Sequence, residues 1–176
     1  MIFYKVLLAI GSDKPGIVNL VSAFITERGC NIEDSRMSVM GDDFALVMLF
    51  SGPLPAIEKV KADIKNLEGT VGLTTLLKDT KAPASRPREA SLPYTLEAFG
   101  MDHPGIVNEV TGVLHKHKIN VESMETGVGN APVSGTPVFH MHIKIAVPAN
   151  VSINKLKEEF LEVEKRHNLN ITLNPS

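Results

Sequence analysis

The hexapeptide Asp-Lys-Pro-Gly-Ile-Val at residues 13–18 recurs as Asp-His-Pro-Gly-Ile-Val at residues 102–107. An apolar run precedes each copy, from Tyr4 to Ile10 and from Leu92 to Phe99, so each copy lies where a strand is expected to pass into a helix. Proline suits the first helical turn because its missing N–H needs no partner there, and the first helix is predicted to begin at Pro15. The recurrence indicates that the chain is a duplication of one unit.

Each half of the chain predicts the element order βαββαβ. In the first half, strands are predicted over residues 3–10, 30–40, 44–50 and 70–77, and the two helices are expected to end at Gly29 and Gly69. The first of these helices is expected to bury Ile17, Leu20, Val21, Phe24 and Ile25. In the second half, strands are predicted over 93–99, 119–128, 138–147 and 169–173, with helices over 106–114 and 153–163 between them.

The duplication extends beyond the hexapeptide. The same separation along the chain pairs Asn31 with Asn120 and Glu33 with Glu122. The second helices of the two halves are separated by more residues along the chain than the first helices are, so the second half must contain an insertion. Its predicted place is the Gly- and Pro-rich loop 127–137, because loops tolerate insertions. We therefore expect two domains, residues 1–79 and 92–176, joined by a linker over residues 80–91.

Each unit belongs to the α+β class, and we expect a four-stranded antiparallel sheet with both helices on one face. In the second unit the polar residues His140, His142 and Lys144 alternate with apolar ones, as in a strand with one face in water. In the first unit the corresponding run 44–50 is apolar at every position. The open face of the first sheet is therefore expected to be covered, by the second unit or by another chain.

The composition limits the classes of function. A net charge of −2 supplies no basic footprint for phosphate backbones, so direct nucleic-acid binding is not expected. The basic residues near the linker, Lys78, Lys81, Arg86 and Arg88, are interpreted as solvated. No run approaches the roughly 20 apolar residues of a membrane span, and the N-terminus does not resemble a signal peptide. We expect a cytoplasmic protein.

Catalytic, metal and cofactor hypotheses find little support. Cys30 corresponds to Ile119 in the other half, so a buried, inert thiol is expected rather than a nucleophile. His140 and His142 share a strand face but lack a third metal ligand. Ile17 stands where a phosphate-binding loop needs lysine, and the glycines at 127 and 129 open no helix, which removes both nucleotide-binding motifs. We predict no catalytic residue, no metal and no cofactor.

The duplicated βαββαβ order with its D-x-P-G-I-V turns resembles a tandem pair of ACT domains, which have a ferredoxin-like fold. Residues 29–36, GCNIEDSR, followed by Gly41 and by LFSG at 49–52, are similar to the glycine cleavage system transcriptional repressor family. The resemblance implies a non-enzymatic regulator and homo-oligomer that binds an amino acid such as glycine or serine where ACT units pair edge to edge. It also implies action through a DNA-binding transcription factor. A detached regulatory subunit of a metabolic enzyme is the alternative.

The resemblance also implies a ligand site, in which the two turns provide backbone groups and Asn31 or Asn120 provides an amide from the neighbouring unit. Free N–H groups at a helix start can accept a carboxylate, and an amide offers a donor and an acceptor. The predicted residues are Ser12, Asp13, Pro15, Gly16, Ile17, Asn31, Met101, Asp102, Pro104, Gly105, Ile106 and Asn120. In the alternative, Asp13 and Asp102 only cap nearby N–H groups, and the two glycines only allow close packing against the sheet.

Overall fold

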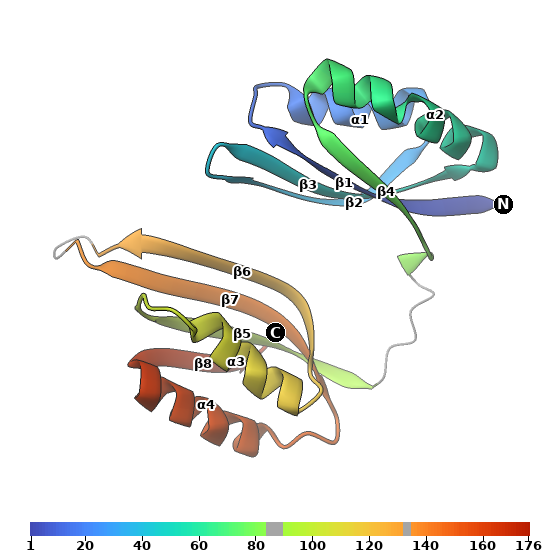
Figure 1. Cartoon of the computed structure of the whole chain (residues 1–176). Coiled ribbons are helices and arrows are strands. Elements are labelled where there is room, and N and C mark those ends of the chain that lie inside the picture. The colour runs from blue at the N-terminus through green and yellow to red at the C-terminus, as the bar shows by residue number, and fades with distance from the viewer. Residues whose placement is uncertain (84–89, 132–134) are drawn as a thin grey trace. The chain divides into compact units, whose positions relative to one another are not determined.

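The computed structural model describes residues 1–83, 90–131 and 135–176 (Figure 1). The chain divides into two compact units, one for each half of the duplication. Much of the predicted linker, together with Arg86 and Arg88, lies outside the described residues, so the boundaries placed at 79 and 92 stay predictions. No helix of the described chain has the length and hydrophobicity needed to cross a membrane.

The first unit has the predicted order of elements. They are β1 (Ile2–Ser12), α1 (Ile17–Glu27), β2 (Asn31–Met40), β3 (Asp43–Pro53), α2 (Leu54–Val71) and β4 (Thr74–Thr80). The sheet order is β2-β3-β1-β4, and every neighbouring pair is antiparallel.

The second unit repeats this topology. Its elements are β5 (Ser91–Met101), α3 (Ile106–Lys116), β6 (Asn120–Asn130), β7 (Pro137–Pro148), α4 (Ile153–His167) and β8 (Leu169–Pro175). The sheet order is β6-β7-β5-β8, again antiparallel throughout. The predicted α+β class and the duplicated βαββαβ order are confirmed.

In each unit both helices cover the same face of the sheet, and the core lies between these two layers (Figure 1). The inward positions of the central strands are almost fully buried; they include Leu7, Met48 and Phe50 in the first unit and Leu96, Ile143 and Ile145 in the second. A buried Lys5 lies at the margin of the first core and forms an ion pair with Asp79. Each unit thus has a hydrophobic core of its own.

Two helix details differ from the prediction. Leu20, placed on the buried face of α1, is 46% exposed. Helix α2 continues through Gly69 to Val71 and ends at Gly72, whose φ of +77° suits glycine. Leu67 and Val71 are buried against the core, and this burial offsets the roughly 1 kcal/mol that a glycine inside a helix costs. The fourth strand therefore begins at Thr74 rather than at residue 70.

The insertion in the second half lies within the predicted segment: Gly129 pairs with Val138 as Met40 pairs with Asp43, and the extra residues lie between them. Residues 127–130, predicted to belong to a loop, form the end of β6, and Asn130 pairs with Pro137 at the start of β7. The connection between the two strands is residues 131–136, of which 132–134 lie outside the described chain. Within the strand, Gly127 lies under the ring of His140, where a side chain at 127 would collide with that ring.

The uncovered faces of the two sheets have the predicted character. On β7, His140 and Lys144 are exposed, whereas Met141 and Ile143 between them are buried. On β3, the outward residues are Ala45, Val47 and Leu49, and Val47 is 45% exposed. The expectation that another surface covers this apolar face stays a prediction.

A glutamate from the second helix reaches one edge of each sheet. In the first unit Glu68 Oε1 accepts hydrogen bonds from the backbone N–H of Thr75 at 3.0 Å and from its hydroxyl at 2.8 Å. At the corresponding place in the second unit, Glu164 Oε1 accepts a hydrogen bond from the N–H of Ile171 at 2.5 Å. Because an unpaired N–H on an edge strand can recruit another strand, each contact removes one free donor from β4 or β8.

Candidate ligand-binding site

The repeated turn has the same backbone conformation in both units. Gly16 is the N-cap of α1 with φ +91°, and Gly105 is the N-cap of α3 with φ +101°. Both helices therefore begin at the residue after the glycine, and the prediction that Pro15 occupies the first helical turn is wrong. Proline instead fixes the turn that precedes the helix, and the left-handed glycine redirects the chain into it.

The conformation explains why glycine is present at these two positions. A Cβ built on Gly16 or on Gly105 would meet no atom within 4 Å. The alternative that these glycines allow close packing against the sheet is therefore wrong. A positive φ alone accounts for them, since it is costly for any residue that carries a Cβ.

The second alternative, that the aspartates only cap nearby N–H groups, also fails. The N-caps are Gly16 and Gly105, and within the described ranges the side chains of Asp13 and Asp102 accept no hydrogen bond from an N–H group. The backbone N–H of Asp13 donates to the carbonyl of Asp42 at 3.0 Å, and that of Asp102 donates to Pro137 at 3.1 Å. The first N–H of α1, that of Ile17, contacts the carbonyl of Lys14 at 3.4 Å. The turn thus uses some of its own donors, and the following first-turn N–H groups are the ones left for an anion.

Exposure divides the predicted turn residues into two groups. Most of them are exposed: Ser12, Asp13, Pro15, Gly16, Met101, Asp102, Pro104 and Gly105. Ile17 and Ile106 are almost fully buried in their cores. These isoleucines can offer a ligand only backbone atoms, and their side chains hold the start of each helix against the sheet.

The residue after the aspartate differs between the turns but lies in the same place. Lys14 extends its ammonium group to the C-terminal end of α2, beside Gly72. His103 places Nε2 3.3 Å from the carbonyl oxygen of His167 at the end of α4, and the two imidazole rings stack with centroids 4.8 Å apart. Both side chains contact the end of the second helix, where carbonyl groups lack helical partners.

Asn31 and Asn120 begin β2 and β6, at the end of each sheet opposite the turn. Asn31 pairs with Ser51, which pairs with Tyr4, whereas the turn follows Ser12. Eight residues of strand separate Tyr4 from Ser12, or about 26 Å at roughly 3.3 Å per residue. A single unit does not bring its asparagine and its turn together, so the predicted site needs a second unit.

Both β2 and β6 contain a bulge at the same place, next to the asparagine. The register shifts between Ile32 and Asp34 and again between Val121 and Ser123, so Glu33 and Glu122 are the extra residues. Bulges redirect side chains and are frequent beside functional sites.

Glu33 is held in place by its neighbours. Its Oε1 accepts hydrogen bonds from the hydroxyl of Ser51 at 2.5 Å and from the amide Nδ2 of Asn31 at 3.2 Å. These bonds, the one from Ser51 first, lower the pKa of the Glu33 carboxyl. Glu33 was absent from the predicted site; its recurrence as Glu122, next to the repeated asparagine, is the sequence signal that could have identified it.

The other chemical candidates take ordinary structural positions. Cys30 is buried, as predicted, and burial raises the pKa of its thiol. On the second sheet, His142 Nδ1 lies 3.4 Å from Glu97 Oε1. Within the described ranges, no group of three or more His, Cys, Asp or Glu side chains is arranged to hold a metal ion.

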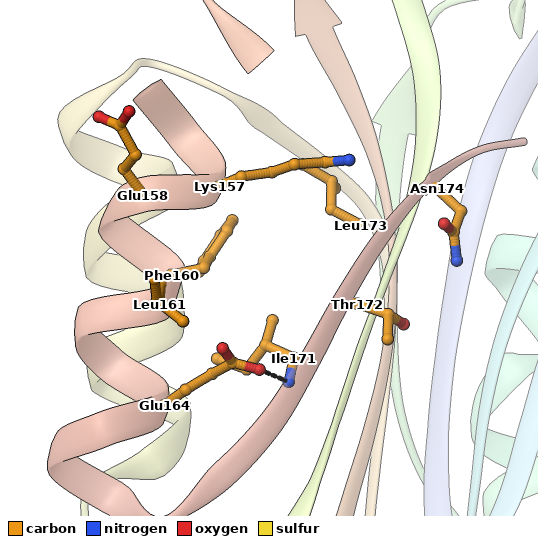
Figure 2. Close-up of a pocket in the computed structure, with 9 residues that line it drawn as sticks. All are labelled: Lys157, Glu158, Phe160, Leu161, Glu164, Ile171, Thr172, Leu173 and Asn174. Atoms are coloured by element: carbon orange, nitrogen blue, oxygen red, sulfur yellow. Dashed lines mark hydrogen bonds between the residues drawn. The ribbon is translucent and has the colours of Figure 1, made fainter. Parts of the chain in front are cut away.

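A groove lies between α4 and β8, away from the predicted site (Figure 2). It has a volume of about 480 Å³, and Phe160 and Ile171 contribute apolar surface between charged side chains that include Lys157 and Glu158. Figure 2 shows Glu164 reaching across it to the N–H of Ile171. None of the predicted ligand residues lines this groove, and the Glu164 carboxylate in it is already hydrogen-bonded to the N–H of Ile171.

This chain is similar to known proteins in sequence and in fold. One ACT-domain model matches residues 5–78 and a second matches residues 94–160. The glycine cleavage system transcriptional repressor of Escherichia coli is 28% identical over 157 residues, which cover 89% of this chain and 82% of the relative.

Two crystal structures cover nearly the whole chain. An unknown protein from Galdieria sulphuraria aligns with a TM-score of 0.81 and 26% identity, over 100% of this chain and 99% of the other. A protein provisionally assigned as a glycine cleavage system transcriptional repressor aligns with a TM-score of 0.71 and 28% identity, over 99% and 97%. The matches of the two ACT-domain models agree with the duplicated topology. The chain therefore belongs to the ACT-domain family, with two ACT domains in tandem.

Proposed function

We propose that this chain is a cytoplasmic, non-enzymatic regulator that binds a small amino acid, such as glycine or serine, and controls transcription through a DNA-binding protein partner. Its similarity to the E. coli glycine cleavage system transcriptional repressor supports the regulatory role. The net charge of −2 favours contact with a protein over contact with DNA itself.

The observation that carries the proposal is the separation of the two halves of the site within each unit. The exposed turn at Gly16 lies at one end of the sheet and Asn31 at the other. A ligand that needs both can bind only where two units meet, so ligand binding and assembly are coupled. This coupling is what a sensor requires, because a ligand shifts an equilibrium only by binding one arrangement better than another.

The edges of the sheet favour β2 as the strand that pairs. Glu68 already satisfies an edge N–H of β4, whereas β2 exposes Met37, Val39 and Met40. In an antiparallel pairing of two β2 strands, the start of one lies beside the end of the other. That end is also the turn end, since Met40 pairs with Asp43 and Asp43 with Ser12. A homo-oligomer formed in this way has Asn31 of one copy at the turn end of its partner.

Calorimetric titration with glycine, serine and other amino acids tests ligand binding. We expect at least one of them to bind, and we expect Asn31→Ala to weaken that binding about tenfold or more while the melting temperature stays within error. An unchanged affinity in Asn31→Ala would refute this site. Absence of binding across the whole set would refute amino acid sensing.

Affinity capture from a lysate of the source cell tests the partner. Recovery of a DNA-binding transcription factor supports the proposal, and recovery of a metabolic enzyme whose activity responds to the chain contradicts it. A mobility shift of DNA by this chain alone at physiological salt would contradict action through a protein, because non-specific phosphate contacts weaken steeply with salt.

A further inference from the structure

The start of β2 presents two hydrogen-bond acceptors side by side. Ser51 and Asn31 both donate to Oε1 of Glu33. Asn31 uses its amide N–H₂ in this bond, so its carbonyl oxygen is free to accept. Among the described residues, neither that oxygen nor Glu33 Oε2 has a hydrogen-bond donor. The next group to bind here must therefore donate hydrogen bonds.

The charge at this position is also uncompensated. Glu33 forms no ion pair with any described residue, and the nearby Arg36 pairs with Asp34 on its own strand. The hydrogen bonds from Ser51 and Asn31 favour the charged carboxylate, whose pKa is lowered. A carboxylate beside an amide carbonyl attracts an ammonium group and repels the carboxylate of a ligand.

The second unit lacks this arrangement. Glu122 occupies the same bulge and Asn120 the same strand start, but Asn120 pairs with Ala146 where Asn31 pairs with Ser51. Alanine has no hydroxyl to hold the carboxylate. Ser51 is itself 6% exposed, so its hydroxyl is fixed by packing and loses little freedom in orienting Glu33.

We propose that Glu33, oriented by Ser51 and Asn31, binds the α-ammonium group of the ligand, and that only the first unit does so. This inference rests on the proposed function, because it assigns a role within the same interface site. It divides the ligand between two surfaces, with the ammonium group at the start of β2 and the carboxylate at the turn of the neighbouring unit. The selected class is amino acids with a free α-ammonium group, and 2-hydroxy acids are rejected.

Matched pairs of ligands isolate the ammonium group. Glycine and glycolate, or serine and glycerate, share a carboxylate and differ at the α-substituent. Calorimetry on the full chain should show the amino acid binding at least tenfold more tightly than the hydroxy acid. Glu33→Gln should reduce this preference to less than about threefold, by weakening the amino acid and not the hydroxy acid. A general structural defect would weaken both ligands.

Ser51→Ala and Glu122→Gln complete the test. Ser51→Ala keeps the Glu33 carboxylate but removes the hydrogen bond that orients it, and should lower the preference for the amino acid about threefold. Ser51→Thr restores a hydroxyl and should restore this preference. Glu122→Gln, the matched change in the second unit, should leave binding unchanged. Circular dichroism melting verifies that each variant is folded. If Glu33→Gln does not fold, Ser51→Ala alone tests the proposal.

The possible failures can be told apart. If the unmodified chain binds no amino acid, the proposed function itself fails. If it binds one and Glu33→Gln keeps the full preference, the function stands and this inference is wrong. If Glu122→Gln weakens binding as much as Glu33→Gln, the restriction to the first unit is wrong.

Discussion

The open faces of the two sheets have diverged while the faces against the helices have not. In the first unit Leu76, Leu8 and Val47 lie in one row across β4, β1 and β3. The corresponding row in the second unit is Thr172, Glu97 and His142 across β8, β5 and β7. One row is apolar and exposed, and the other is polar, with a contact of 3.4 Å between Glu97 and His142.

The inward rows of the same strands stay apolar in both units. Leu7 pairs with Met48 and Leu96 pairs with Ile143, and all four side chains are almost fully buried. Burial therefore constrains the helix face in both copies, whereas the open face is free to become polar or apolar according to what it meets. The two units therefore share a fold and differ in the open face that is available to a partner.

The largest expected effect tests whether the two cores are independent. Phe50→Ala removes a fully buried ring from the first core and should destabilise that unit by about 3–5 kcal/mol. Hydrogen exchange read by mass spectrometry should show loss of protection in peptides of the first unit only. Ile145→Ala, at the corresponding position, should do the same in the second. Equal loss in both units from either variant would show that the chain unfolds as one body.

The next effect tests whether the two turns are equivalent. Gly16→Ala and Gly105→Ala should each cost about 1–2 kcal/mol, because the new Cβ has space but the left-handed backbone disfavours it. Gly69→Ala is the control: it also has space, lies inside α2 and should stabilise by about 0.5–1 kcal/mol. Urea denaturation measures all three. A neutral Gly16→Ala would contradict the strain argument.

The third effect tests whether the apolar row is covered in solution. Leu76 is 58% exposed, and burying the remainder of such a side chain is worth about 1 kcal/mol. Leu76→Lys should weaken self-association about fivefold by sedimentation if a second copy covers the face. If the chain covers its own face, the variant should lower the free energy of unfolding instead. Glu97→Lys, in the corresponding row of the second unit, is the control because the Glu97 side chain is 60% exposed. No change in either measurement would show that the face is open to water.

The smallest expected effect concerns the β4 edge of the first sheet. The hydrogen bond from Lys65, followed by the two from Thr75 and then by the charge of Lys65, lowers the pKa of Glu68 to about 2. A lowered pKa stabilises the fold above the ordinary value of 4.5, and this contribution is lost as the pH falls from about 4.5 to about 2. Glu68→Gln should make the free energy of unfolding less dependent on pH in this range. Glu27→Gln, on α1, is the control; an equal change there would contradict the assignment.

Periodicity and repetition predicted most of the fold. The alternation of His140 and Lys144 with buried residues, and the spacing of Ile57, Val60 and Leu67 on α2, follow from burial on one face and so appear directly in the sequence. The errors concern ends of elements. Gly69 has the composition of a helix end, yet packing of Val71 carries the helix to Gly72. Pro15 has the composition of a first turn, yet the left-handed Gly16 follows it.

The candidate site was predicted less completely than the fold. The turns and the asparagines were singled out because they are repeated, and their role in binding a ligand stays a prediction. Glu33 was not singled out because the hydrogen bond that orients it comes from Ser51, which is distant in the sequence and reaches it only through strand pairing. Nothing in the spacing of residues distinguishes Ser51 from Ala146 until the register of the sheet is known.

The sequence by itself determined that a βαββαβ unit is duplicated, that each copy has an apolar core and a Pro-Gly turn after its first strand, and that the two open faces differ. These properties are local or periodic, so the order of residues encodes them directly. Only the tertiary structure decided that the turn and the asparagine lie at opposite ends of one sheet, that Glu68 satisfies an N–H at one edge, and that Glu33 is held beside Asn31. These depend on which strands pair and in what register, and the register is set by the packing of the whole core.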